Sequence, residues 1–206
     1  MTMKQIPERR PGELALYARN YLKYSERYPG ELYILDAGCG DGRDSFFLAE
    51  NLNCHIVAVD ISAEAISTAK ASCPPELQKR IEFLCYDVNN LVDKYDIIFA
   101  AQLYQVLNPG ERARFKETVK RCLKKGGLLF LSTLSANDSY YASTARQSGN
   151  GQDGTENSPH LSSREELETD FDFLYISALF ERSHSEQAAG SAVRMHTSWI
   201  LLGEMQ

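Results

Sequence analysis

A glycine-rich segment and a following aspartate have the residue types and spacing of a nucleotide-like binding site. The segment LDAGCGDG spans residues 35–42. Gly38 and Gly40 lack side chains, so a ligand can approach the backbone closely and the chain can adopt positive φ angles. Asp60 follows Gly40 by 20 residues, at a position where a carboxylate can accept hydrogen bonds from both hydroxyls of a ribose.

Two further acidic positions decide which ligand this turn favours. Asp87 can accept a hydrogen bond from an adenine amino group, with Val88 packing beside the ring. The spacing G-x-G-x-G differs from the G-x-G-x-x-G fingerprint of dinucleotide sites, whose pyrophosphate an acidic turn would repel. Asp36 and Asp41 therefore favour S-adenosylmethionine, which carries a sulfonium cation and no phosphate. A tight turn without a ligand, and ordinary turn chemistry at Asp87, are the competing structural interpretations.

These residues need a scaffold that brings strand ends together, and the apolar pattern predicts one. Short apolar runs alternate with amphipathic segments, which is typical of a parallel sheet buried on both faces. The predicted strands are 33–37, 55–60, 81–87, 95–101 and 128–134, and the predicted helices are 11–26, 43–51, 63–71 and 109–125, the last ending at a Gly-Gly pair. Gly38, Asp60, Asp87 and Gln102 each fall at the end of such a strand, at the carboxyl edge where ligands bind.

The chain changes character after residue 134. Residues 137–159 are rich in Ser, Gly, Asn, Asp and Gln, and we expect the stretch 135–160 to be a mobile loop beside the substrate. Ser163 predicts a capped helix, with Glu166 completing a capping box. Residues 173–184 and 193–204 predict two strands joined by a turn at Gly190. We expect one α/β domain over residues 1–206.

The motifs resemble those of class I S-adenosylmethionine-dependent methyltransferases. The similar segments are LDAGCGDGR, VAVDIS, KYDIIFAAQLYQVL and RCLKKGGLLFLS, and the resemblance is strongest over residues 33–134. It implies a doubly wound, Rossmann-like sheet of seven strands, mostly parallel with an antiparallel C-terminal strand, and an N-terminal segment (residues 1–28) acting as a lid. Within the class, GCGDGRDSFFLA, DVNNL and RCLKKGG look most like the tellurite-resistance methyltransferases. The predicted cofactor-binding residues are Asp36, Gly38, Cys39, Gly40, Asp60, Ile61, Asp87, Val88 and Gln102.

Methyl transfer from a sulfonium requires alignment and exclusion of water, and needs a base only for an acceptor that carries a proton. His184, His160 and His196 are the candidate bases, each with an ordinary structural role as the alternative. His184 aligns with a histidine of the tellurite-resistance group, but Ser185 follows it where that group has arginine, which argues against an oxyanion substrate.

Aromatic and N-terminal residues give weaker hypotheses. Tyr104, Tyr140 and Tyr141 could line an aromatic pocket, and Tyr17 or Arg19 could contact the methionine carboxylate. Core packing for Tyr17 and a surface charge for Arg19 are the favoured interpretations.

Composition narrows the class of partner. A net charge of −6 argues against nucleic acid, and the basic run 112–125 has the pattern of a solvated helix face. The five cysteines form no CxxC pair, so no metal site is predicted. Cys54, Cys85 and Cys122 lie in apolar runs and should behave as small hydrophobes. Without a secretory signal or a membrane span, we expect a cytoplasmic enzyme.

The reaction itself is left with three alternatives. A small-molecule methyl acceptor is preferred because no second domain is evident. An rRNA or protein methyltransferase, and a nucleotide-binding oxidoreductase or non-catalytic binder of the same fold, are the competing hypotheses. The oligomeric state is not predicted.

Overall fold

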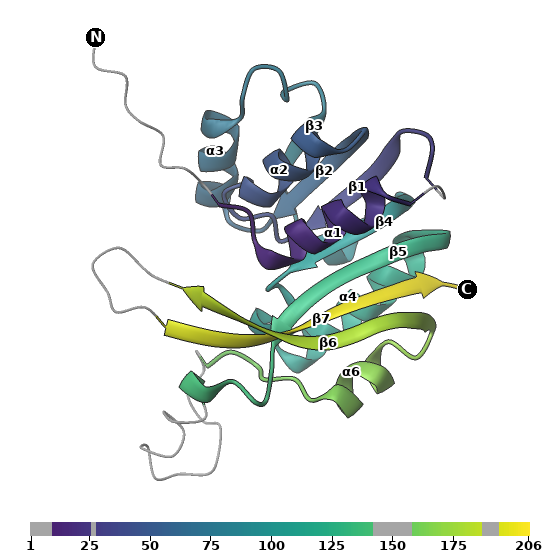
Figure 1. Cartoon of the computed structure of the whole chain (residues 1–206). Coiled ribbons are helices and arrows are strands. Elements are labelled where there is room, and N and C mark those ends of the chain that lie inside the picture. Colours follow the sequence, from purple (N-terminus) through teal and green to yellow (C-terminus); the bar gives the residue numbers. More distant parts are fainter. Residues whose placement is uncertain (1–9, 26–27, 142–157, 187–193) are drawn as a thin grey trace.

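The chain was analysed as a computed structural model, which describes residues 10–25, 28–141, 158–186 and 194–206 (Figure 1). These residues form a seven-stranded sheet in the order β3-β2-β1-β4-β5-β7-β6. The strands are β1 (Leu32–Ala37), β2 (Cys54–Asp60), β3 (Ile81–Cys85), β4 (Tyr95–Ala101), β5 (Leu123–Leu134), β6 (Leu174–Glu186) and β7 (Arg194–Met205). Strands β1 to β5 pair in parallel, whereas β7 is antiparallel to both β5 and β6. The predicted doubly wound sheet with an antiparallel C-terminal strand is confirmed.

Helices cover both faces of the sheet (Figure 1). They are α1 (Glu13–Lys23), α2 (Arg43–Asn51), α3 (Ala63–Ser72), α4 (Pro109–Cys122) and α6 (Arg164–Asp170), with short 3-10 turns η1 (Val88–Asn90) and η2 (Tyr104–Val106). Successive strand residues belong to opposite core clusters: Ile97 packs on the side of α1 to α3, and Ile98 on the side of α4 and α6. Because both faces are buried, the strands are apolar without interruption.

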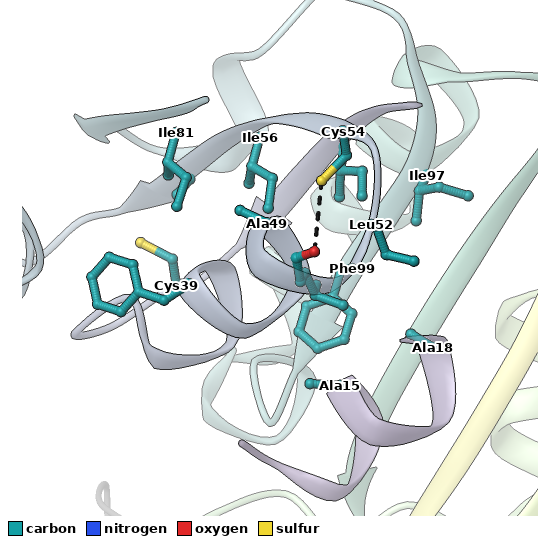
Figure 2. Packing of buried hydrophobic residues seen from close by; sticks show 14 of the residues in the cluster. Ala15, Ala18, Cys39, Ala49, Leu52, Cys54, Ile56, Ile81, Ile97 and Phe99 are labelled. Carbon is teal, nitrogen blue, oxygen red and sulfur yellow. Dashed lines mark hydrogen bonds between the residues drawn. The ribbon is translucent and has the colours of Figure 1, made fainter. Parts of the chain in front are cut away.

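Helix α1 belongs to the core along most of its length. Figure 2 shows Ala15 and Ala18 on the side of α1 that faces Phe99 of β4. All three residues are at most 1% exposed, and the small alanines let the helix approach the sheet closely. In the same cluster the thiol of Cys54 lies 3.9 Å from the carbonyl oxygen of Leu48 (Figure 2).

The helix starts follow their caps. The Ser62 hydroxyl accepts from the Ala65 amide at 3.2 Å at the start of α3. Asn108 and Glu111 form a reciprocal capping box at the start of α4, which the sequence analysis did not identify.

Two local predictions, for the end of α4 and for Cys85, were wrong. The helix α4 ends at Cys122, not at residue 125, because Leu123 already pairs with Tyr95, and the chain through Gly126 (φ 73°) lies within a register shift of β5. Cys85 ends β3 and is exposed, so it is not a core residue.

The start of α6 differs from the prediction as well. Ser163 accepts from the Glu166 amide at 3.1 Å, but the Glu166 carboxylate contacts His160 and completes no capping box that the structure describes.

Some predictions concern residues outside the described ranges. They are residues 1–9 of the predicted lid, most of the predicted loop 135–160, and the turn at Gly190. The described part of this N-terminal segment consists mainly of α1, which packs in the core.

Candidate functional site

The glycine-rich turn after β1 adopts a conformation that requires glycine. Gly38 has φ 74°, and a Cβ there would lie 3.0 Å from the Cδ1 atom of Leu103. Gly40 has φ 54°, and the space where its Cβ would lie is open. The amide of Gly38 donates to the carbonyl of Val59 at 2.9 Å, which ties the turn to the end of β2. The turn therefore presents bare backbone to a ligand at the carboxyl edge of the sheet.

Asp60 is held in place by this turn. Its Oδ2 atom accepts from the Gly40 amide at 2.9 Å, and its Oδ1 atom accepts from the Ser62 amide at 2.8 Å. Each carboxylate oxygen keeps a second acceptor site. Asp60 can therefore accept from two ligand hydroxyls without losing the bonds that orient it.

A cavity of about 400 Å³ opens beside Asp60, and we call it the strand-end cavity. Its lining residues are Gly38, Val59, Asp60, Ile61, Tyr86, Asp87, Val88, Asn89, Ala101, Gln102, Leu103, Val106, Leu107 and Glu111. Ile61 and Val106 are 78% and 68% exposed, so they offer apolar surface to a ligand. None of the described residues that line this cavity is Lys or Arg, which suits adenosine and disfavours a pyrophosphate.

Gln102 marks the place where three cavities meet. It borders the strand-end cavity, a narrow cavity of about 80 Å³ near α1 and a larger one beneath the β6–β7 hairpin. Its φ of 56° is the one positive value among the described non-glycine residues. Its amide nitrogen Nε2 donates to the hydroxyls of Ser132 at 3.2 Å and Ser198 at 3.3 Å, which fixes the side chain at this junction. Strained residues of this kind concentrate at functional sites.

The larger cavity, of about 720 Å³, is here called the hairpin cavity. Its lining residues are Arg10, Pro11, Gly12, Glu13, Arg43, Gln102, Gln105, Leu134, Tyr141, Ser183, His184, Ser185, Met195 and His196. The pairing of β5 with β7 ends at Leu134 and Ser198, while the pairing of β6 with β7 continues to Glu186 and Arg194. The hairpin thus extends past the carboxyl edge of β5 and covers the site.

Two of the predicted histidines meet in this cavity. His184 and His196 are register partners on β6 and β7, and their ring centroids lie 6.1 Å apart. The Nδ1 atom of His196 lies 3.2 Å from the Oδ2 atom of Asp138. The rings of Tyr140 and Tyr141 pack against His196 with centroids at 5.4 and 5.7 Å.

The third candidate base lies elsewhere. His160 does not line any of the three cavities. Its Nε2 atom contacts Oε1 of Glu166 at 2.6 Å. Tyr104, an aromatic candidate, is fully buried, and its hydroxyl donates to Asp170.

The structure brings six of the nine predicted cofactor residues into the strand-end cavity: Gly38, Asp60, Ile61, Asp87, Val88 and Gln102. Asp87 also caps η1, since its Oδ1 atom accepts from the Asn89 amide at 2.9 Å, so turn chemistry and exposure to the cavity coexist. Gly40 contributes through the hydrogen bond that its backbone amide donates to the Asp60 carboxylate.

Asp36 and Cys39 lie behind the turn. Asp36 is 2% exposed and its Oδ2 atom accepts from the Ser45 hydroxyl at 2.5 Å. Burial raises the pKa of Asp36 to about 7, with smaller contributions from Asp44 and Asp60, although the Ser45 hydrogen bond opposes the rise. Burial also raises the pKa of the Cys39 thiol. These residues support the turn from within the core.

The N-terminal segment reaches the site through its first residues. The amide of Gly12 donates to Oδ1 of Asp44 at 2.7 Å, and Gly12 and Glu13 line both the narrow and the hairpin cavities. Tyr17 packs against Phe130 and Phe180, which confirms its core role.

Arg19, the weaker hypothesis for a contact with the methionine carboxylate, does not reach the cavities. Arg19 lies with its guanidinium carbon 5.4 Å from the centroid of the Phe47 ring and lines none of the three cavities. Arg43 instead lines the narrow and hairpin cavities, with its side chain 53% exposed. Its place directly after the glycine turn was the signal available in the sequence.

The sequence analysis missed several lining residues. Tyr86, Val106 and Glu111 complete the strand-end cavity, and Asp138 contacts His196 from a distant segment. The positions of Tyr86 and Val106 beside strand ends could have indicated them, whereas nothing local pointed to Asp138.

Within the described ranges no three His, Cys, Asp or Glu side chains are grouped so as to hold a metal ion. No described helix has the length and apolarity to span a membrane.

Comparisons with known proteins agree with this fold. Residues 34–127 match the family model described as a methyltransferase domain. The ubiquinone biosynthesis O-methyltransferase of Coxiella burnetii is 31% identical over 118 residues, which cover 54% of this chain and 47% of that protein. The chain spans between about a quarter and about half of the length of the curated relatives first matched.

Solved structures share the fold at low sequence identity. TehB from Haemophilus influenzae aligns with a TM-score of 0.69 and 15% identity, over 93% of this chain and 61% of that one. Magnesium protoporphyrin IX methyltransferase from Synechocystis PCC 6803, with bound SAH, aligns with a TM-score of 0.70 and 18% identity, over 93% of this chain and 81% of that one.

The domain match over residues 34–127 and the shared fold of the solved structures make this chain similar to S-adenosylmethionine-dependent methyltransferases. The residues of the strand-end cavity fit that cofactor: acidic groups stand where ribose and adenine donors would lie, and bare backbone lies at the turn.

Proposed function

We propose that this chain transfers the methyl group of S-adenosylmethionine to a small-molecule acceptor. The observation that carries the proposal is the position of Gln102, which borders the strand-end cavity and the hairpin cavity at once. A cofactor bound at the turn and an acceptor bound under the hairpin would meet at this residue. Such alignment is the main requirement of an in-line displacement.

The chain offers a partner for each part of the cofactor. Asp60 would accept from the ribose hydroxyls and Asp87 from the adenine amino group. Ile61 and Val106 would pack against the adenine, and Arg43 would neutralise the methionine carboxylate. The cofactor supplies an electrophilic methyl group on a sulfonium, and the acidic strand-end cavity suits that positive charge.

The hairpin cavity supports an acceptor of small size. Its volume of about 720 Å³ lies within the usual range of small-molecule pockets, roughly 300–1,000 Å³. The names of the similar proteins, for ubiquinone biosynthesis and for magnesium protoporphyrin IX, also refer to small molecules.

The basic run on α4 does not favour a nucleic-acid substrate. Several of its cations are engaged within the chain: Arg112 donates to the carbonyl of Leu107, Arg121 to that of Leu91, and Lys116 pairs with Asp170. A net charge of −6 also disfavours binding to the negatively charged phosphate backbone of a nucleic acid. The odd cysteine count favours a reducing compartment, and we propose the cytoplasm as the site of the reaction.

Calorimetric titration tests this proposal directly. We expect the chain to bind S-adenosylhomocysteine but not NADH. Asp60→Ala should weaken S-adenosylhomocysteine binding by about 10- to 100-fold, since hydrogen bonds to a charged group contribute about 1.5–3 kcal/mol. Asp93→Ala removes an exposed aspartate that lines none of the three cavities, and it should leave the affinity unchanged. Binding of NADH, or of neither ligand, would refute the proposal.

A further inference from the structure

The β6–β7 hairpin carries two histidines that do not line the strand-end cavity. His184 and His196 are register partners, both line the hairpin cavity, and their rings lie 6.1 Å apart. His184 also borders the narrow cavity together with Gln102 and Ser198. The pair thus spans the distance from the acceptor side of the cavity to the junction where the methyl group would be transferred.

The carboxylate of Asp138 contacts the ring of His196. It is fully buried, and its Oδ2 atom lies 3.2 Å from Nδ1 of His196 and accepts from the Thr197 amide at 2.7 Å. Its Oδ1 atom accepts from the Tyr141 amide at 3.0 Å. Two backbone N–H groups and the His196 ring therefore converge on this carboxylate. A carboxylate that accepts from Nδ1 places the ring proton there and makes Nε2 of His196 the basic nitrogen.

We propose that His196 is the general base of the reaction, that Asp138 is its positioning residue, and that the acceptor is an aromatic compound methylated on a hydroxyl group. This inference rests on the proposed function. It specifies the acceptor class and the proton path of the same site.

The choice of a phenolic hydroxyl follows from comparing the pKa of the acceptor group with that of the base. Imidazole has a pKa of about 6.5 and a phenol a pKa of about 10, so the pKa difference that opposes proton transfer is modest. The difference is far larger for an alcohol or for water, whose pKa is near 15.7. A thiol, with a pKa of about 8.5, is partly ionised already and needs a base less. Tyr141, Met195, Leu134 and Pro11 provide the cavity with surface for a ring.

The step balances without a further reagent. The acceptor oxygen forms a bond to the methyl carbon, and the sulfonium–methyl bond breaks with its electron pair retained on sulfur. The phenolic proton passes to Nε2 of His196, which then releases it to solvent.

Other charged and titratable groups surround this histidine and would shape its pH response. Tyr140 and Tyr141 pack on His196 from the segment after β5, and Arg194 of β7 lies over the Tyr140 ring at 4.8 Å. The remaining groups of this kind along the described cavity wall are His184 on β6, Glu13 on α1, Arg43 on α2 and Arg10.

The ¹⁵N shifts of the imidazole rings in the intact chain test Asp138 without any acceptor. His196→Gln assigns the His196 signals. The wild-type ring should carry its proton on Nδ1, and Asp138→Asn should move the shifts away from that tautomer, because the carboxylate that accepts from Nδ1 is lost. Glu166→Gln is the matched control. It alters the His160–Glu166 contact, which lies outside the three cavities, and should leave the His196 signals unmoved. An unchanged His196 tautomer in Asp138→Asn would overturn the positioning role.

Turnover with radiolabelled S-adenosylmethionine tests the base and the acceptor class. The probes are a series of ring-substituted phenols, with inorganic iodide as a nucleophile that carries no proton. We expect methylation of phenols, a kcat reduced about 10²- to 10⁴-fold in His196→Gln with a smaller change in KM, and loss of the His-dependent rise of kcat with pH. The Glu166→Gln control should retain the wild-type profile.

The outcomes separate this inference from the proposed function. Binding of S-adenosylhomocysteine together with methylation of iodide but no phenol would overturn the inference alone. So would an unaltered pH profile in a folded His196→Gln variant. Failure to bind S-adenosylhomocysteine would instead refute the proposed function.

Discussion

Asp36, which is buried behind the glycine turn, should make the free energy of unfolding depend on pH. The side chain is 2% exposed, and burial raises its pKa to about 7 from the ordinary 3.8. At pH 5 the folded protein therefore holds a proton on Asp36 that the unfolded chain has released, and this proton stabilises the fold. As pH rises through 7 the contribution is lost, and the two pKa values give a loss of roughly 2–3 kcal/mol between pH 5 and pH 8.

Asp36→Asn should remove this dependence. The amide cannot ionise, and its oxygen can still accept from the Ser45 hydroxyl. We expect the free energy of unfolding of the variant, relative to the wild type, to rise by roughly 2–3 kcal/mol from pH 5 to pH 8, measured by urea denaturation at each pH. Asp93→Asn, at an exposed position, serves as the control. Parallel curves for wild type and Asp36→Asn would show that Asp36 is ionised in the folded protein at pH 5, and the reasoning would be refuted.

Further substitutions and one chemical probe test other parts of the structure. Gly38→Ala should lower the free energy of unfolding by about 1–3 kcal/mol, because the left-handed backbone and the Leu103 contact both oppose a side chain; a change below 0.5 kcal/mol would contradict the turn geometry. At the other strained position, Gln102→Gly should be about 1 kcal/mol more stable than Gln102→Ala in urea unfolding, since only glycine tolerates φ 56° without strain, and equal stability would contradict the assigned angle. Phe99→Ala should cost about 3–5 kcal/mol in the same assay, because the ring is 1% exposed and packs against α1; a loss of under 1 kcal/mol would mean that the site collapses or is not packed. Titration with a thiol reagent should modify the exposed Cys85 quickly and the four buried cysteines only after denaturation; rapid reaction of several thiols in the folded protein would contradict their burial.

Local pattern predicted the framework well. The helix Arg43–Asn51 and the strand Tyr95–Ala101 lie where the sequence analysis expected them. Both faces of the parallel sheet are buried, so its strands must be apolar throughout, and this requirement is visible in any short window of sequence. The cofactor turn was also visible, because its glycines and Asp60 are fixed by backbone geometry within one βαβ unit.

The ends of elements depended on contacts that no window contains. The helix α4 stops at Cys122 because Leu123 pairs with Tyr95 of another strand. Similarly, Asp36 and Cys39 share the turn with Gly38 but face the core rather than the cavity, and only the packing of α2 against the sheet decides this.

The tertiary structure brings together the histidines and Asp138 at the hairpin cavity. Asp138 and His196 are 58 residues apart, and their contact follows from the register of β5, β7 and β6. A shift of one residue in that register would turn His184 and His196 to the opposite face. The sequence by itself therefore determined the fold class and the glycine turn, whose causes are local. Tertiary structure selected His184 and His196 and set His160 apart, because the pairing of distant strands depends on the packing of the whole sheet.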